Sequence, residues 1–252
     1  MYQIYRKILS DETCDKIINK ITNEYFKKEK THFVREGKEF FFKNISNLKL
    51  LKEVVQKICE RINFEKFDNS LYIDHAFLLL KPGGGNATTC HQDRPFWIKK
   101  EINNNQVSMF TCWVALEQIL ENKGCLLVYS EKEVDIKSFN TINLIFNHKD
   151  NRLKSGNFSW SIDDGRIDAN KLRSVEVSKG DIVAFDAFEV HSSTNNITDK
   201  HRLSFKIVFR RGNGLINVKN FLNNFYLCSL YLLIIYNFKK LLSFILNRNI
   251  DY

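Results

Sequence analysis

Residues able to bind a metal occur in two segments that lie far apart in the sequence. The first is His91-Gln92-Asp93, and the second begins at His191. Side chains of an extended strand alternate between its two faces, so His91 and Asp93 would point the same way. Two imidazoles and one carboxylate on one face of a metal are the ligand set of non-haem Fe(II) sites, because further positions stay open. We therefore predict a metal site formed by His91, Asp93 and His191.

A candidate anion clamp follows the second segment. Arg202 lies in the next apolar run after His191, and its guanidinium presents a fixed fork that matches a carboxylate. A His-x-Asp pair alone is common on protein surfaces, and the metal prediction rests on His191 and Arg202 as well. A zinc hydrolase with the same three ligands would leave Arg202 without a role and has no evident general base.

Composition favours a soluble globular protein and disfavours nucleic acid as a partner. The chain has 252 residues, of which 44% are hydrophobic and 27% charged, and a formal net charge of +9. This length suffices for one domain with a large core. A positive net charge attracts anionic small molecules, membrane surfaces or nucleic acid. Nucleic acid is the weakest of the three as a partner, because the sequence has no arginine-rich tract interleaved with aromatic residues. The six cysteines are scattered without a C-x-x-C pair, which predicts reduced thiols and a cytoplasmic location.

Hydrophobic patterning predicts helices first and strands afterwards. Ser10-Asp11-Glu12 is typical of a helix start and a second helix is expected after Asn47, so the helical part spans residues 1–65. Runs of β-branched and aromatic residues then predict strands. They are expected at 71–81, 88–93, 107–117, 125–129, 174–178, 181–186, 188–193 and 201–210. The fold class is therefore mainly β with flanking helices, and the polar stretch 131–172 is expected to be a lid or binding loop.

The segment 215–252 differs from the rest of the chain. Residues 225–236 are almost wholly apolar and are followed by Lys239 and Lys240. A membrane span needs about 20 mostly apolar residues, and extending this one would bury both lysines at about 2.5–3.5 kcal/mol each. We expect first an apolar helical tail packed on the domain or on a partner, second a peripheral membrane contact through residues 221–246, and third a true span.

Several motifs, taken in order, resemble one enzyme family. They are His91-Gln92-Asp93, Cys112-Trp113-Val114-Ala115-Leu116-Glu117, Asn122-Lys123-Gly124-Cys125-Leu126, Gly180-Asp181-Ile182-Val183-Ala184-Phe185, His191-Ser192-Ser193-Thr194-Asn195 and Arg202-Leu203-Ser204. From about residue 4 to 211 the chain resembles the phytanoyl-CoA dioxygenase family of Fe(II)- and 2-oxoglutarate-dependent oxygenases. The resemblance implies a double-stranded β-helix core, jelly-roll or cupin-like, at 71–211 within a dioxygenase domain of residues 1–214.

The resemblance also assigns roles to residues of the site. The three predicted metal ligands match the family's iron ligands, and Arg202 matches the residue that binds the distal carboxylate of 2-oxoglutarate. Ser204 is then a second contact to that carboxylate, and Trp113 matches an aromatic that lines the cosubstrate site. The expected cofactors are Fe(II), 2-oxoglutarate and O2. Without the resemblance, Trp113 would be interpreted as a core residue.

The reaction implied is hydroxylation of an unactivated C–H bond in a small-molecule substrate, anionic or lipid-linked, with release of succinate and CO2. Asp93 supplies a carboxylate where a halogenating enzyme leaves an iron position for halide, so hydroxylation is favoured. Arg94, Phe96 and Trp97 are expected either to shape the substrate site or, equally, to anchor a half-buried loop. Lys81, at the end of a predicted strand, is expected to be a solvated surface lysine rather than a cosubstrate contact.

Two departures from the family pattern bear on function. The strand after Asn122-Lys123-Gly124-Cys125-Leu126 normally closes with Pro-Gly-Ser-His, whereas this chain has Val128-Tyr129-Ser130-Glu131-Lys132. The tail from residue 215 has no counterpart in the family pattern. The substrate of a relative is therefore not carried over. The alternative to an oxygenase is a non-catalytic β-helix protein that binds a ligand or partner.

Overall fold

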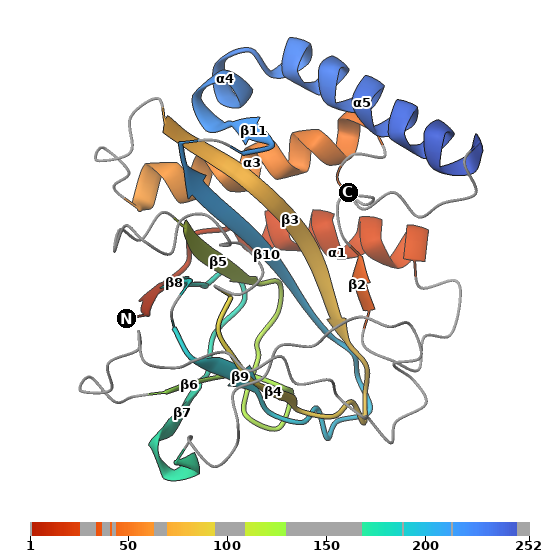
Figure 1. Ribbon diagram of the computed structural model, residues 1–252. Helices are drawn as coiled ribbons and strands as arrows, with labels where there is room; N and C mark the ends of the chain where they lie inside the picture. Colours follow the sequence, from red (N-terminus) through yellow and green to blue (C-terminus); the bar gives the residue numbers. More distant parts are fainter. Residues whose placement is uncertain are drawn as a thin grey trace.

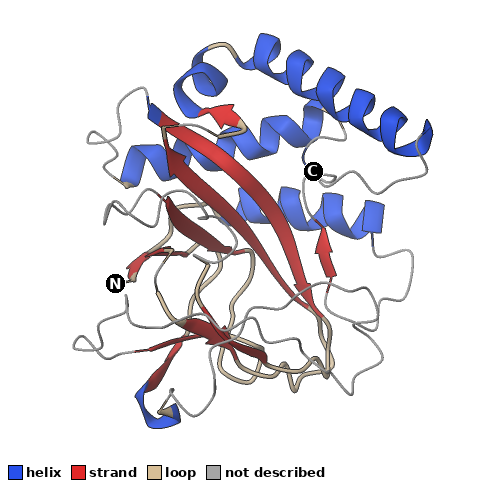
Figure 2. Ribbon diagram, viewed as in Figure 1, coloured by secondary structure: helices blue, strands red, loops and turns tan. Residues whose placement is uncertain are grey.

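In the computed structural model, helices cover one side of two packed antiparallel sheets (Figure 1). The structure describes residues 2–25, 34–36, 41, 44–62, 70–93, 109–129, 168–187, 189–212 and 214–245. Arg94, Phe96 and Trp97 lie outside these residues, as does most of the predicted loop 131–172. Figure 2 shows the helical layer on one side of the strands.

Among the described residues, the larger sheet has seven strands and the smaller has four. The larger sheet runs in the order β1 (Gln3–Tyr5), β8 (Ile182–Asp186), β5 (Met109–Ala115), β10 (Arg202–Arg211), β3 (Leu71–Lys81) and β11 (Ile216–Asn217), and β2 (Val34–Glu36) also pairs with β3. The smaller sheet has the order β4 (Thr88–His91), β9 (His191–Ser193), β6 (Leu126–Tyr129) and β7 (Leu172–Val175). The two sheets form the double-stranded β-helix that the family resemblance implies, within the mainly β fold with flanking helices that the strand pattern predicts.

The predicted strands are present with shifted ends. The strand expected at 88–93 ends at His91, so Asp93 lies beyond the last paired residue and is not held by strand alternation. The strand expected at 174–178 is β7, which begins and ends earlier, and a separate bridge pairs Val177 with Ile119. β1, β2 and β11 are not predicted, because strands of two or three residues carry no readable alternation.

Strand β10 connects the helical side of the molecule with the interior between the sheets. Its side chains alternate between the two faces of the sheet. Those on one face are large, apolar and buried in the same core as the helices: Leu203, Phe205, Ile207 and Phe209. Those on the other face include Arg202, Ser204 and Lys206. A second core, made by residues of β5, β8, β6 and β7, fills the space between the sheets.

Two amphipathic helices cover the larger sheet. Helix α1 (Asp11–Tyr25) follows Ser10, whose Oγ accepts a hydrogen bond from the Thr13 N–H at 3.1 Å. Helix α3 (Ile45–Arg61) is capped by Asn44, whose side chain accepts from the Asn47 N–H at 2.9 Å, so it begins three residues before the expected start. The apolar faces of both helices join the core that contains the inward face of β10.

The turn before β8 fixes the N-terminal segment to the larger sheet. Gly180 has a φ of +82°, and its carbonyl accepts a hydrogen bond from the Leu9 N–H at 3.1 Å. A Cβ at Gly180 would lie 2.2 Å from the Leu9 carbonyl oxygen. The carboxylate of buried Asp181 accepts from the Lys7 N–H at 2.9 Å and from Arg6 at 2.7 Å. The Gly180-Asp181 motif therefore has a structural role here.

The C-terminal segment is helical. Helix α4 (Val218–Asn223) leads into α5 (Phe225–Ile245), which packs on α3 and α4 (Figure 1). Phe225 and Leu232 of α5 are buried in the core under the helices. None of the helices in the described part of the chain is long and apolar enough to cross a membrane.

Candidate metal centre

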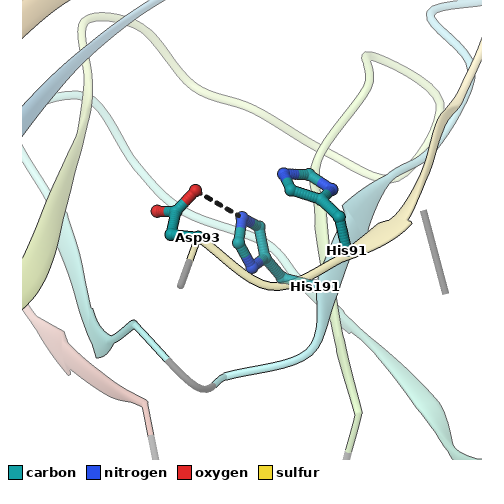
Figure 3. Close-up of side chains that lie close together, drawn as sticks. All are labelled: His91, Asp93 and His191. Carbon is teal, nitrogen blue, oxygen red and sulfur yellow. Dashed lines mark ion pairs between the residues drawn. The ribbon is translucent and has the colours of Figure 1, made fainter. Parts of the chain in front are cut away.

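Three side chains lie close together where β4 ends and β9 begins in the smaller sheet. His91 is the last residue of β4 and is paired in register with His191, the first residue of β9. Their ring centroids are 4.2 Å apart, and Asp93 Oδ1 lies 3.9 Å from His191 Nε2 (Figure 3). One ligand atom from each of the three residues lies within 4.8 Å of the other two. Among the described residues, this is the group that could hold a metal ion.

His191 is held as a neutral imidazole. Its Nδ1 lies 2.9 Å from the Glu189 carbonyl oxygen, to which it donates, so the Nε2 lone pair faces Asp93. Burial, and then the neighbouring His91, lower the pKa of His191 to about 3, although Asp93 opposes them. The Phe185 ring packs against the imidazole with centroids 4.6 Å apart. A neutral imidazole with a fixed tautomer is the form that binds a metal.

Asp93 is held as a carboxylate. Burial alone would raise the pKa of Asp93, but the Lys206 ammonium and the imidazoles of His191 and His91 hold it well below its usual range. Lys206 Nζ donates to Oδ1 at 2.8 Å and to Oδ2 at 2.7 Å. Thr111 Oγ1 also donates to Oδ2 at 2.7 Å. Lys206 contacts both oxygens, and Oδ1 lies 3.9 Å from His191 Nε2, where it can bind a metal.

Lys206 and Thr111 were not predicted as site residues from the sequence. The alternation of side chains along a strand could have indicated both residues. Lys206 lies on the same face of β10 as Arg202 and Ser204. Thr111 of β5 pairs in register with Val208, the next β10 residue on that face. A search for polar residues on the face of β10 that carries Arg202 would have found Lys206.

The other end of the site is formed by buried donors on β10. Arg202 is 2% exposed, donates from Nη1 to the Gly124 carbonyl oxygen at 2.7 Å, and lies 5.5 Å from the centre of the Trp113 ring. Burial lowers the pKa of Arg202 to about 10, so the side chain stays charged at neutral pH. Its Nε and the Oγ of Ser204 are buried without a hydrogen-bond partner among the described residues.

These unsatisfied atoms fit a bound carboxylate. A buried donor without a partner costs about 1–3 kcal/mol, and a carboxylate supplies acceptors for both Arg202 and Ser204. The donor set at the other end, two imidazoles and a carboxylate, suits Fe(II). The residues present therefore fit both an iron ion and an anionic cosubstrate.

Lys81 is not the solvated surface lysine that its sequence position suggests. It is 1% exposed, because its strand β3 lies inside the larger sheet with Arg202 as its register partner. Its Nζ donates to Ser193 Oγ at 2.8 Å and to the Thr194 carbonyl oxygen at 2.6 Å. Burial and then Arg202 lower the pKa of Lys81 to about 7. Two buried basic groups thus lie near each other at this end of the site.

The fold and the site together define a metal-dependent oxygenase built on a double-stranded β-helix. The family model described as phytanoyl-CoA dioxygenase (PhyH) matches residues 4–204. The chain therefore belongs to the phytanoyl-CoA dioxygenase family, whose members are Fe(II)- and 2-oxoglutarate-dependent oxygenases. A comparison with curated proteins found no match.

Several solved structures, SnoN, EvdO2 and SnoK among them, have a fold similar to that of this chain. The epimerase SnoN, in complex with Fe3+, alpha ketoglutarate and nogalamycin RO, is 15% identical, with 83% of this chain and 78% of SnoN covered and a TM-score of 0.55. EvdO2 from Micromonospora carbonacea var. aurantiaca, complexed with 2-oxoglutarate, is 16% identical over 83% and 86% of the two chains, with a TM-score of 0.56. The carbocyclase SnoK is 14% identical over 86% and 82%, with a TM-score of 0.51. At these identities the likeness shows a shared fold.

Proposed function

We propose that this protein hydroxylates an unactivated C–H bond of a small-molecule substrate and converts 2-oxoglutarate to succinate and CO2. Fe(II) would be held by His91, Asp93 and His191. The observation that carries the proposal is the convergence of their three ligand atoms within 4.8 Å of one another. When bound, the iron with 2-oxoglutarate and O2 supplies the oxidising power that side chains lack.

The chain's own residues would bind and orient the reactants. Arg202 and Ser204 would bind the distal carboxylate of 2-oxoglutarate, because their buried donor atoms are unsatisfied in the described part of the structure. Trp113, beside the guanidinium of Arg202, would line the cosubstrate site. Lys206, which donates to both oxygens of Asp93, and Thr111, which donates to Oδ2, would fix the orientation of the carboxylate at the metal.

Two features support hydroxylation of an anionic compound. Asp93 provides a carboxylate ligand, so no iron position is reserved for halide. The net charge of +9 favours anionic substrates, including lipid-linked ones. We retain Arg94, Phe96 and Trp97 as proposed substrate contacts, because they lie in the short stretch after Asp93 in the sequence.

The proposal is tested by screening acidic and lipid-linked compounds for succinate release under 18O2. Hydroxylation predicts label in the product as well as in succinate, with no release by His191→Ala. Succinate release without label in the product would point to another oxidation, such as epimerisation or ring closure. A purified, iron-loaded protein that converts no 2-oxoglutarate with any compound would favour the non-catalytic alternative.

A further inference from the structure

Helix α5 carries apolar side chains on two opposite faces. One face packs on α3 and α4, and Phe225 and Leu232 are buried there. The other face lies at the surface of the molecule (Figure 1) and carries six large apolar residues that are 56% to 73% exposed. These residues, here called the outer stripe of α5, are Tyr226, Leu227, Leu230, Tyr231, Ile234 and Phe238. A helix that is apolar on all sides is normally covered on all sides.

The outer stripe is a continuous feature and not a scatter of single residues. Its members recur every three or four positions along the helix and so lie side by side. The other large hydrophobic residues exposed in the described ranges lie away from α5: Ile45 begins α3, and Leu120 and Ile197 lie in loops between strands. Single exposed apolar residues need no explanation, whereas contiguous apolar patches mark interaction surfaces.

The surroundings of the outer stripe are basic. At one end, Lys49 Nζ lies 5.8 Å from the centre of the Tyr226 ring, and Lys52 Nζ lies 5.2 Å from that of Phe225. At the other end, Lys239 directly follows Phe238. The sequence has no Asp or Glu between Gly212 and Ile250. An occupant with negative charge therefore complements the stripe.

A second copy of the chain complements it less well. In an antiparallel pairing of two α5 helices, the Lys49 end of one copy would face the Lys239 end of the other. In a parallel pairing, Lys239 would face its own counterpart. Both arrangements place like charges together at an interface, which is unfavourable. No acidic residue within α5 could offset this repulsion.

We propose that the outer stripe docks onto an anionic lipid surface. The helix would lie in the plane of the membrane, with its apolar side chains between the acyl chains and its lysines among the headgroups. This orientation agrees with the absence of a membrane-spanning helix in the described ranges. The contact does not depend on the proposed reaction.

Co-sedimentation of the full chain with vesicles tests the proposal. Vesicles of phosphatidylcholine alone are compared with vesicles that also contain phosphatidylglycerol. We expect binding to the anionic vesicles only, and a fall in apparent affinity of about tenfold or more in Leu230→Ser/Ile234→Ser, because both side chains lose apolar contact. Ile197→Ser, at a residue that is 75% exposed in the loop between β9 and β10, is the matched control and should bind as the unmodified protein does.

A second variant separates charge from apolar contact and does not depend on the folding of the first. Lys49→Gln/Lys239→Gln should weaken binding to anionic vesicles and make the remaining binding less dependent on salt, because fewer charges are left to screen. Light scattering of the lipid-free protein reports whether a second copy covers the stripe instead. A dimer that Leu230→Ser/Ile234→Ser dissociates, equal binding to both vesicle types, or no binding to either would overturn the proposal.

Discussion

The positive charge of Arg202 is buried. Among the described residues, the acidic side chain that stabilises this charge is that of Glu117. Replacing Arg202 with Ala should weaken 2-oxoglutarate binding by about 2–3 kcal/mol, or roughly 30- to 150-fold, because a charge-assisted pair of hydrogen bonds is lost. Metal affinity should stay nearly unchanged, since Arg202 contacts no proposed ligand. Calorimetry with Mn(II) and then 2-oxoglutarate measures both. Arg202→Lys, which keeps the charge but not the fork, should lose less. Equal 2-oxoglutarate affinity in all three proteins would refute the assignment.

The ion pair between Lys206 and Asp93 predicts a stability effect that depends on metal. Lys206→Met leaves a buried carboxylate without its cation, and breaking such a pair costs about 3 kcal/mol in the metal-free protein. A metal bound to Asp93 would replace the lost positive charge, so the loss should be smaller with Mn(II). Urea unfolding with chelator and with Mn(II) measures the difference, and Lys206→Arg is the control that keeps the charge. The same loss under both conditions would show that Asp93 does not bind the metal.

Lys81 predicts a pH dependence of stability. Its pKa is about 7 in the folded protein and 10.5 in the unfolded chain, so between these values the unfolded state binds more protons. The free energy of unfolding should therefore rise with pH over this window, relative to Lys81→Met, by at most about 1.4 kcal/mol per pH unit. Below pH 7 the difference between the two proteins should level off. A difference that falls as the pH rises would mean that burial does not lower the pKa of Lys81.

For individual residues, the sequence indicated the group formed by His91, Asp93 and His191, and it indicated Arg202 as the other end of the site. It could not indicate that Asp93 lies past the end of β4, because strand ends are set by pairing with β9. The burial of Lys81 was also hidden, since a lysine beside a Pro-Gly turn ordinarily reaches solvent. Only the position of β3 inside the larger sheet removes it from water.

Among the structural elements, the turn before β8 requires glycine at position 180. Gly180→Ala combines a left-handed backbone with a Cβ 2.2 Å from the Leu9 carbonyl oxygen, and we expect a loss of about 3 kcal/mol or more. Gly212 is the matched control, with a φ of +86° and nothing within 4 Å of an added Cβ. Gly212→Ala should cost only the backbone strain of about 1–2 kcal/mol. Thermal or urea unfolding compares them, and equal losses would contradict a steric role for Leu9.

The longer elements were predictable because their patterns are long. The alternation in β3 and β10 and the apolar stripes of α1 and α3 extend over ten residues or more. The short strands β1, β2 and β11 owe their existence to neighbours already in place, such as β8 for β1. The start of α3 differed from expectation because Asn44 and Asn47 are both good capping residues, and only packing decides between them.

For the molecule as a whole, the fold places the carboxylate of Asp93 and the imidazoles of His91 and His191 at one end of a polar row, and the buried basic groups Arg202 and Lys81 at the other. β10 supplies Arg202, Ser204 and Lys206 of that row from a single strand face, and the helices on its opposite face hold the strand in place. The site therefore depends on β10 remaining paired with both β3 and β5.

The most direct test of this account is an anaerobic titration of the metal-free protein with Fe(II) and then 2-oxoglutarate, followed by visible absorption. The account predicts a weak, saturable charge-transfer band once both are present, and its loss in His91→Ala. In Arg202→Ala the band should appear only at higher 2-oxoglutarate concentration. A folded protein that binds Fe(II) and 2-oxoglutarate without the band, or a band that persists in His91→Ala, would contradict the assignment of His91, Asp93 and His191 as the iron ligands.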